Sequence, residues 1–521
     1  METSRTKNSI RNFKSTLFLQ LLNKVMAFVV RTVFIKMLNS EYLGINGLFT
    51  DVLTLLSFAE LGIGTAIVFS MYRPIASNDK EKLKSLMQLY RKCYIIIGSI
   101  ILILGICLTP FLRFIIKDIP NIKENISFIY LLFLINTSIS YFFAYKKSII
   151  TAYQQESQIN RINSFIILLK SGIEIILLLL TKNYILYLIV SIMATFLQNY
   201  AISRKADKMF PYLKDDNVKK LPEEETKSIF KNVKSLVIYK VGGIILGGTD
   251  NIIMSAMINV AVVGLCSNYT MIINAVKTII SNALNSITAS IGNLNATSNI
   301  EKKEEIFYEL TLINYFVYSF ISIAFIVLLN PLITIWLGEE YVLGLSVVIA
   351  MSFSFFIEGI RLPAYTYRTT LGLFEKGRIT PFIATVVNIA SSIVLCKFFG
   401  VLGIFIGTCL AQISSYSWID AYLIHKYEFK KSVKKYNIKT VKYYICFILC
   451  TIITLNLSNI LHFSGLLYLF INMIIAIIVP NLLNIILLRK CDEFYRVKIK
   501  FFIPFVNKLD NKFKNILLKF N

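Results

Sequence analysis

The feature that most constrains this chain is a series of long apolar segments separated by short loops that carry most of its charge. Of its 521 residues, 56% are hydrophobic and 16% are charged, whereas an average soluble domain has about 25% charged residues. A helix needs roughly 20 mostly apolar residues to cross a bilayer. We therefore predict an all-α polytopic membrane protein.

The apolar segments predict about fourteen transmembrane helices. In chain order the predicted spans are 13–38, 43–72, 86–112, 124–148, 158–181, 183–206, 228–257, 260–291, 304–329, 342–370, 378–397, 401–425, 440–459 and 465–488. Because the number of crossings is even, both ends of the chain are expected on the same side of the membrane.

Lysine and arginine are distributed very unequally between the two sides that these spans define. With the N-terminus placed inside, 43 of the 55 basic residues fall in cytoplasmic segments and six in external loops, while six lie within spans. Basic loops are retained in the cytoplasm, so we expect both termini there. The net charge of +25 does not indicate nucleic-acid binding, because the basic residues form no single basic domain or face.

A charged loop with two prolines, 207–227, predicts a division of the chain into two halves. The predicted parts are an N-lobe at 1–206, a cytoplasmic linker at 207–227, a C-lobe at 228–430, a terminal helix pair at 431–488 and a basic amphipathic cytoplasmic tail at 489–521. We expect the tail to lie on anionic lipid of the inner leaflet, with a protein partner as the alternative. Eight scattered cysteines and two histidines predict neither a disulfide framework nor a metal site.

Two segments near the start of the predicted lobes resemble each other. Lys24 precedes the glycine-containing segment Leu43–Phe49, and Lys240 precedes the similar segment Val263–Tyr269. Six helices in each lobe would give the two halves the same orientation, related by an axis along the membrane normal, with a site between them. The alternative is that these are two unrelated membrane hairpins.

Four basic residues within spans are candidates for a cationic, anion-binding cavity. A charged side chain in mid-bilayer costs about 2.5–3.5 kcal/mol on insertion scales and normally faces a cavity or a partner. At about 1.5 Å per residue, Lys24, Lys240 and Lys277 share one depth near the midplane. Arg31 follows Lys24 by two helical turns and is expected on the same face.

Acidic residues within spans are candidates for ion coupling or for a gate. Glu60, near the helix-weakening Gly62 and Gly64, is the first candidate for a coupling-ion site. The alternative is a charge that pairs to orient helices, and the glycines serve equally well for close packing. Asp250 is expected to pair with Lys24 or Arg31 and so close an outer gate.

Two short-range pairs have a simpler interpretation. Lys170 and Glu174 are four residues apart on one helix and are expected to pair structurally. Glu358, the third gate candidate, is three residues from Arg361 and is expected to pair with it in the same way. From residue 443 to residue 488 there is no formally charged side chain, so this hairpin is expected to face lipid.

The segment Tyr42–Phe49, running into Leu55–Ala66, resembles the polysaccharide or O-antigen flippases of the MOP (MATE-like) exporter superfamily. Thr249–Ile253 followed by Val263–Tyr269 resembles them in the other half. The resemblance implies a V-shaped arrangement of two six-helix lobes plus a C-terminal helix pair. In related flippases the central cavity is cationic and the last helix pair helps to hold a lipid tail.

The resemblance also implies a function. Such a transporter moves undecaprenyl-pyrophosphate-linked oligosaccharide from the inner to the outer leaflet of the bacterial cytoplasmic membrane by alternating access. It is not an enzyme and needs no cofactor beyond a coupling ion, Na⁺ or H⁺, in line with the lack of a Walker A pattern in the sequence. The glycan would serve O-antigen, capsule or exopolysaccharide synthesis, with a polysaccharide polymerase and other assembly proteins as partners.

Several alternatives remain open at this point. A lipid II flippase for peptidoglycan would share the cationic cavity, whereas a MATE drug exporter would carry mainly acidic groups. A membrane-embedded polysaccharide polymerase or glycosyltransferase usually has a large external loop, and every external loop here is short. A scaffold of the biosynthetic complex would leave the midplane charges unexplained.

Overall fold

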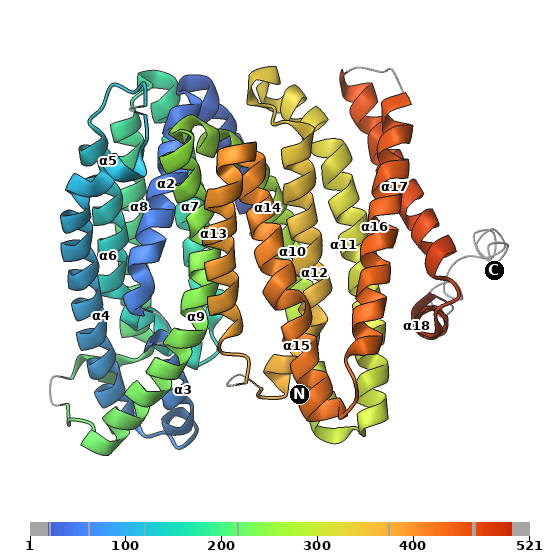
Figure 1. Ribbon diagram of the computed structural model, residues 1–521. Helices are drawn as coiled ribbons and strands as arrows, with labels where there is room; N and C mark the ends of the chain where they lie inside the picture. The colour runs from blue at the N-terminus through green and yellow to red at the C-terminus, as the bar shows by residue number, and fades with distance from the viewer. Residues whose placement is uncertain are drawn as a thin grey trace, which may run out of the picture. The chain divides into compact units, whose positions relative to one another are not determined.

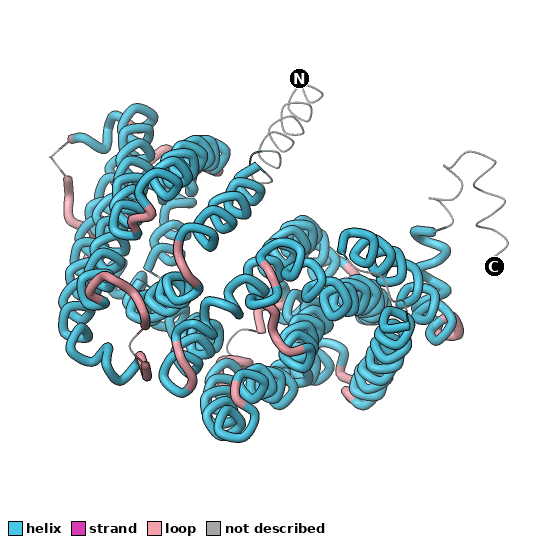
Figure 2. The backbone as a smooth tube through the Cα atoms, turned by 90° about the horizontal axis from the view of Figure 1, so that it is seen from above, coloured by secondary structure: helices cyan, strands magenta, loops and turns pink. Residues whose placement is uncertain are grey.

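The secondary structure of the computed structural model consists of helices joined by loops, with no strand in the part of the chain that it describes (Figures 1 and 2). The described residues are 19, 22–60, 63–118, 120–215, 218–373, 376–460 and 465–502. Within these ranges the side chains of residues 58–59, 65, 214, 232, 234–247, 283–286, 289, 296 and 501–502 are not described.

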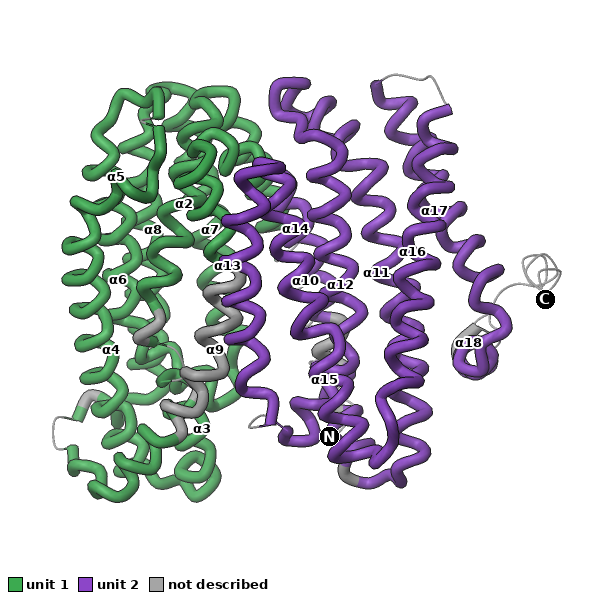
Figure 3. The backbone as a smooth tube through the Cα atoms, in the orientation of Figure 1, with its two compact units in different colours: residues 1–267 green, residues 268–521 purple. Residues whose placement is uncertain are grey.

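The chain forms two compact units, Met1–Ser267 and Asn268–Asn521 (Figure 3). The helices of unit 1 are residues 22–37, α2 (Ser40–Leu56), α3 (Ile63–Ala76), α4 (Lys80–Leu108), α5 (Leu112–Ile115), α6 (Ile126–Ala152), α7 (Glu156–Thr181), α8 (Tyr184–Met209), α9 (Glu223–Met257) and the beginning of α10 (Val260–Thr297). Those of unit 2 are the rest of α10, α11 (Ile300–Leu337), α12 (Leu345–Thr370), α13 (Thr380–Phe399), α14 (Val401–Ala411), α15 (Ser417–Ile424), α16 (Lys434–Ile460), α17 (Gly465–Leu488) and α18 (Asp492–Val497).

The predicted membrane architecture is confirmed. Among the described residues, 11 helices are long and apolar enough to cross a membrane. The three other predicted spans correspond to helix 22–37, to the pair α2 and α3, and to α9. The predicted lobe boundaries stay a prediction, as does the V-shaped arrangement. By contacts the division lies inside α10, and α9 packs against α2 and α3 within unit 1.

The second predicted span is broken rather than continuous. After α2 the chain makes a short 3-10 turn, Ser57–Glu60, before α3 begins at Ile63. A Cβ at Gly64 would lie only 2.7 Å from the Tyr90 hydroxyl, so this glycine permits close packing of α3 on α4. The break therefore coincides with the glycine-containing segment, and at least one of its glycines also has a packing role.

The loops of unit 1 alternate between two ends of the helix bundle, as the predicted topology requires. Ion pairs join the loops predicted to be cytoplasmic, and hydrogen bonds join those predicted to be external. The cytoplasmic contacts are Lys82–Glu225 at 2.7 Å, Lys84–Asp215 at 2.7 Å and Lys146–Asp207 at 2.8 Å. The external contacts are Tyr42 Oη to Glu124 Oε2 at 2.5 Å and Lys117 Nζ to the Met257 carbonyl at 3.0 Å.

Unit 2 has a corresponding basic end. The start of α11 is tied to the segments around α15, α16 and α18 by ion pairs at the end of the unit that is predicted to be cytoplasmic. These pairs are Lys303–Glu428 at 2.6 Å, Lys431–Glu304 at 2.5 Å and Lys500–Glu309 at 2.6 Å. In each unit, therefore, the basic loops gather at one end, which is the structural counterpart of the charge sorting in the sequence.

The two resembling segments meet at a reciprocal glycine contact in unit 1. A Cβ on Gly44 of α2 would lie 1.9 Å from the Val260 carbonyl oxygen, and a Cβ on Gly264 of α10 would lie 2.1 Å from that of Ser40. Each glycine thus meets the residue four positions before the other. Only glycine lets the two helix starts approach so closely, and the symmetry of the contact agrees with an internal repeat.

The uncharged hairpin, formed by α16 from residue 443 onward and by α17, packs on unit 2 through a few buried polar groups. Asn484 accepts a hydrogen bond from Tyr315 Oη at 2.5 Å and donates one to Ser319 Oγ at 3.2 Å, which fixes α17 to α11. Most outward side chains of the hairpin are apolar, among them Ile445, Leu449, Ile453, Leu466, Phe470 and Ile486. A lipid-facing hairpin is expected to have this division between its two faces.

Candidate functional site

Helix 22–37 presents Lys24 as an exposed cation. Its neighbour Asn23 donates a hydrogen bond to Ser164 Oγ of α7 at 3.0 Å, which fixes the rotation of the helix on unit 1. Lys24 itself makes no hydrogen bond or ion pair with a described residue. Ser164 lies inside the apolar helix α7. Lys24, next to Asn23, is therefore attached to the backbone at a depth well within the membrane-spanning bundle.

Arg31 lies two helical turns beyond Lys24, about 10 Å further along the axis. Its Nη2 donates a hydrogen bond to Ser267 Oγ at 2.6 Å, and Ser267 in turn donates to the Gly264 carbonyl at 2.6 Å. Arg31 also interacts electrostatically with Tyr187 of α8. The guanidinium thereby links helix 22–37 to the start of α10, beside the reciprocal glycine contact.

Two further candidates lie on α9. The side chain of Lys240 falls outside the described residues, so its predicted part in a cavity stays a prediction. Asp250 is half-buried and interacts electrostatically with Cys266 of α10. Its predicted pairing with Lys24 or Arg31 likewise stays a prediction.

Glu60 lies at the end of the 3-10 turn between α2 and α3, among tyrosines. Tyr94 Oη donates to Glu60 Oε1 at 2.5 Å, and Tyr90 donates to Tyr94 at 3.0 Å. Tyr141 of α6 contacts the same carboxylate. In the described part of the chain no lysine or arginine pairs with Glu60. A carboxylate held only by hydroxyl groups can accept a proton or a small cation, so Glu60 remains the candidate for ion coupling.

The sequence did not reveal the tyrosines around Glu60. Tyr90 and Tyr94 are four residues apart and therefore share a face of α4, which was the available signal. That signal does not say which helix the face meets. Only the packing of α3 and α6 on α4 assembles the three hydroxyl groups around one carboxylate.

In unit 2, Lys277 of α10 forms an ion pair with Glu358 of α12 at 2.7 Å. Both side chains are accessible, at 40% and 37% of their surface. This corrects the expected pairing of Glu358 with Arg361, which the structure does not contain. It also places Lys277 against a carboxylate, so that this cation is not available to an anion unless the pair opens.

Arg361 instead belongs to a cluster around Asp420 of α15. Its Nε lies 2.9 Å from Asp420 Oδ2, and Nη1 of Arg368 lies 2.8 Å from Oδ1 of the same carboxylate. Asp420 is completely buried, and the Arg361 guanidinium stacks 3.6 Å from the ring centroid of Tyr416. Two guanidinium groups on one carboxylate tie the Pro363-containing helix α12 to α15.

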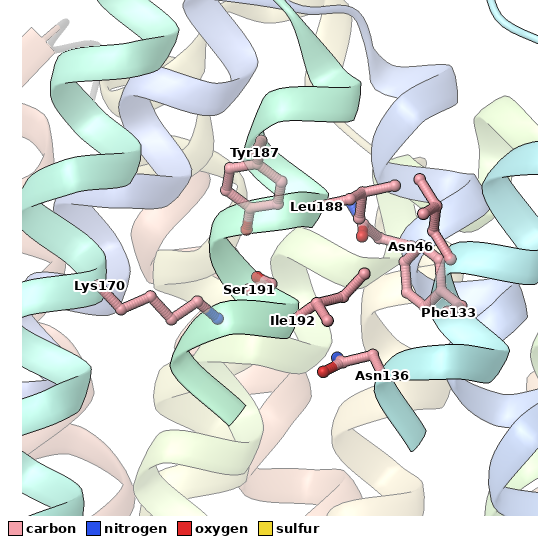
Figure 4. Close-up of a pocket in the computed structure, with 9 residues that line it drawn as sticks. Asn46, Phe133, Asn136, Lys170, Tyr187, Leu188, Ser191 and Ile192 are labelled. Carbon is pink, nitrogen blue, oxygen red and sulfur yellow. The ribbon is translucent and has the colours of Figure 1, made fainter. Parts of the chain in front are cut away.

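The expected pair Lys170–Glu174 is confirmed at 3.4 Å, and Ser191 Oγ donates to the same carboxylate at 2.9 Å. These residues border a cavity of about 200 Å³ inside unit 1 (Figure 4). It is lined by Asn46, Leu132, Phe133, Asn136, Lys170, Tyr187, Leu188, Ser191 and Ile192. Sequence analysis did not indicate this cavity, although Asn46 lies in the segment that carries the family resemblance.

No family model and no curated protein sequence matches this chain. Solved structures do match. The lipid II flippase MurJ in an inward closed conformation has a TM-score of 0.62 at 16% identity, covering 91% of this chain and 98% of its own. An inward-facing multidrug resistance MATE family transporter of the MOP superfamily has a TM-score of 0.58 at 17% identity, covering 76% and 93%.

A mutant of the Vibrio cholerae MATE transporter VcmN is also similar, with a TM-score of 0.54 at 14% identity over 81% of this chain and 97% of that one. At these identities the likeness concerns the fold. The chain therefore has the fold shared by the lipid II flippase and the MATE transporters, which confirms the MATE-like fold predicted from the sequence.

Proposed function

We propose that this protein is a flippase of the bacterial cytoplasmic membrane, with both termini in the cytoplasm. It moves an undecaprenyl-pyrophosphate-linked oligosaccharide from the inner to the outer leaflet by alternating access. The product serves the synthesis of a cell-surface polysaccharide, an O-antigen, capsule or exopolysaccharide, and a polymerase acts after it. The protein carries out transport and no chemical step.

The observation that carries this proposal is the presence of Lys24 and Arg31 on the first helix. Lys24 is exposed within the helix bundle without an ion pair to a described residue, and Arg31 donates to a neutral hydroxyl group. Cations in a membrane-spanning helix are expensive and usually functional. A pyrophosphate is the anion of a polyprenyl-linked glycan, and guanidinium and ammonium groups are its ordinary ligands.

The fold supports transport of a lipid-linked substrate over a drug. The MurJ structure covers 91% of this chain, whereas the MATE structure with the next TM-score covers 76%. The uncharged hairpin, α16 from residue 443 onward together with α17, has a mostly apolar outward face, as a lipid chain would require. A cationic drug would need an anionic cavity, and the exposed charge on helix 22–37 is positive.

A lipid II flippase for peptidoglycan is the second candidate. The specific observation in its favour is the TM-score of 0.62 with MurJ, a lipid II flippase. Both substrates share the polyprenyl pyrophosphate that Lys24 and Arg31 would bind. They differ in the glycan and in the consequence of losing transport.

Deletion of the gene in its native host, followed by analysis of lipid-linked intermediates, tests the proposal. We expect single repeat units to accumulate on the cytoplasmic face, where an added external glycosidase cannot reach them, while the cell still grows. Units already exposed outside would contradict the proposal and indicate a polymerase. Lysis with accumulated lipid II would contradict it in favour of the peptidoglycan flippase.

A further inference from the structure

The cavity inside unit 1 has the lining of a carbohydrate site. Four helices contribute to it: α2 with Asn46, α6 with Asn136, α7 with Lys170 and α8 with Tyr187 and Ser191 (Figure 4). Its volume of about 200 Å³ is several times the roughly 30 Å³ that one water molecule occupies in the liquid. It therefore has room for one sugar ring.

The polar groups of the lining match hydroxyl groups. The amides of Asn46 and Asn136 each offer donors and an acceptor, and the hydroxyl group of Tyr187 can do either. Ser191 Oγ donates its hydrogen to Glu174 and can accept one from a ligand. Oδ1 of Asn136 is buried and accepts no hydrogen bond from a described residue. Burying an acceptor without a hydrogen-bond partner costs free energy, so a ligand that donates a hydrogen bond to this atom would bind favourably.

The rest of the lining is apolar, with Phe133, Leu188 and Ile192 among the residues that border the cavity (Figure 4). A pyranose ring has hydroxyl groups around its edge and C–H groups on its faces. A few placed polar groups on a largely apolar wall are typical of small-molecule sites. The mixture of amides, hydroxyl groups and two aromatic rings fits a pyranose better than it fits a lipid chain.

The charge balance of the cavity excludes its use as the pyrophosphate site. Its one cation, Lys170, lies 3.4 Å from Glu174, and Glu174 also accepts a hydrogen bond from Ser191. The ammonium is thus already neutralised by a buried carboxylate. A neutral ligand with hydroxyl groups meets no charge repulsion in such a site, whereas an anion would be repelled by Glu174.

The cavity is adjacent to the cation that we assign to pyrophosphate. Tyr187 lines the cavity, and its ring centroid lies 5.1 Å from that of Phe34, three residues beyond Arg31 on helix 22–37. In a polyprenyl-linked glycan the first sugar is bonded directly to the pyrophosphate. The order Arg31, Tyr187, cavity in unit 1 therefore follows the order of the covalent bonds in the substrate.

We propose that this cavity binds the sugar ring next to the pyrophosphate of the transported glycan, through Asn46, Asn136, Tyr187 and Ser191. The assignment deepens the proposed function and rests on it. It makes the cavity the part of the protein that distinguishes one glycan from another at its first sugar, while Lys24 and Arg31 hold the part that all such substrates share.

Binding of free monosaccharides tests the proposal. The full-length protein, purified into lipid nanodiscs, is examined by saturation-transfer NMR with millimolar glucose, galactose, N-acetylglucosamine and N-acetylgalactosamine in turn. We expect saturation transfer to at least one of them. Asn136→Leu and Asn46→Leu should each weaken that binding about tenfold, the loss expected for roughly one hydrogen bond.

Asn481→Leu is the matched control. Asn481 is a half-buried asparagine of α17 whose amide donates to the Ile477 carbonyl of its own helix. It lies in unit 2, outside the cavity, so its replacement should leave sugar binding unchanged. Melting temperature and gel-filtration profile show whether each variant is folded. A folded Asn136→Leu protein that binds the sugar like the unmodified chain would overturn the proposal. The proposal would also be overturned if the unmodified protein bound none of the four sugars.

These outcomes are separable from the fate of the proposed function. If gene deletion traps cytoplasmic repeat units but no monosaccharide binds, the cavity assignment fails and the flippase stands. If a monosaccharide binds in an Asn136-dependent way but deletion leaves lipid-linked intermediates unaltered, the flippase fails. The cavity is then a sugar site of a different transporter.

Discussion

Helix 22–37 and α12 both carry basic residues within predicted membrane spans, yet these residues have different partners. On helix 22–37, Lys24 is exposed and Arg31 donates to the hydroxyl group of Ser267. On α12, Arg361 is bound to the carboxylate of Asp420, which is completely buried. A basic residue inside a membrane span is therefore not by itself a binding residue.

The difference separates two uses of charge. An ion pair that is buried adds little net stability, but removing one partner leaves a buried charge and is strongly destabilising. Such pairs hold helices in register. Lys24, which has no ion pair with a described residue, retains its attraction for an external anion. The following predictions test this division, beginning with the largest expected effect.

Replacing Asp420 with alanine should destabilise unit 2 by about 3–5 kcal/mol, because both Arg361 and Arg368 lose the carboxylate that they share. Thermal denaturation of the purified protein, followed by gel filtration, measures the loss. Asp492→Ala, at an exposed position of α18, is the control and should have little effect. Equal melting temperatures for the two variants would contradict a structural role for the Asp420 cluster.

Replacing Lys24 with alanine should reduce export of the surface polysaccharide about tenfold while leaving the melting temperature unchanged. Lys24 makes no contact with a described residue that stabilises the fold, and a lost charged hydrogen bond to substrate is worth about one order of magnitude. Lys36→Ala, exposed on the same helix near its other end, is the control. Normal export by Lys24→Ala would remove Lys24 from the site.

Exchanging Lys277 and Glu358 should keep their ion pair, and with it the stability that substitution of either residue by alanine removes. The pair is accessible to solvent, so each single alanine variant should lose about 1 kcal/mol or less. The double exchange Lys277→Glu with Glu358→Lys keeps the attraction and should export polysaccharide like the unmodified chain. Failure of the exchanged protein to export, with normal melting temperature, would show that Lys277 itself meets the substrate.

The smallest effect concerns Glu493 of α18. Burial raises the pKa of its carboxyl group, but the hydrogen bond from Lys439 and nearby positive charge outweigh this and leave the pKa below its usual range. Its contribution to stability is therefore present above about pH 4.3, the ordinary value for glutamate, and is lost as the pH falls below it.

Hydrogen exchange of residues 492–497 checks this expectation. Exchange in α18 should increase on acidification, relative to exchange in α16, after correction for the intrinsic rate. In Glu493→Gln the additional increase should be absent. An identical pH profile for the variant and the unmodified chain would show that this carboxyl group does not control the docking of α18.

Much of the fold follows from local patterns in the sequence. Runs of about 20 apolar residues and the sorting of basic residues were sufficient to place the spans, because insertion depends on segment hydropathy and flanking charge. The pair Lys170–Glu174 was also predictable, since residues four apart on a helix are neighbours. The break between α2 and α3 was not, because Gly62 and Gly64 lower helix stability locally but serve equally well for close packing in a continuous helix.

The partners of the candidate site residues required the structure. Glu358 has Arg361 three residues away, yet it pairs with Lys277, 81 residues distant in sequence. Which pairing forms depends on the rotation of α12 against α10 and α15, and hydropathy does not determine that rotation. The tyrosines around Glu60 were missed for the same reason.

Transport in liposomes tests the central claim, that Lys24 and Arg31 bind the pyrophosphate of a lipid-linked glycan, most directly. The protein is reconstituted with a fluorescent polyprenyl-pyrophosphate saccharide, and a membrane-impermeant quencher reports its movement between leaflets. The account predicts movement with the unmodified protein, normal movement with Lys36→Ala, and movement at the protein-free rate with the double variant Lys24→Ala, Arg31→Ala. Movement by a folded double variant at the rate of the unmodified protein would contradict it.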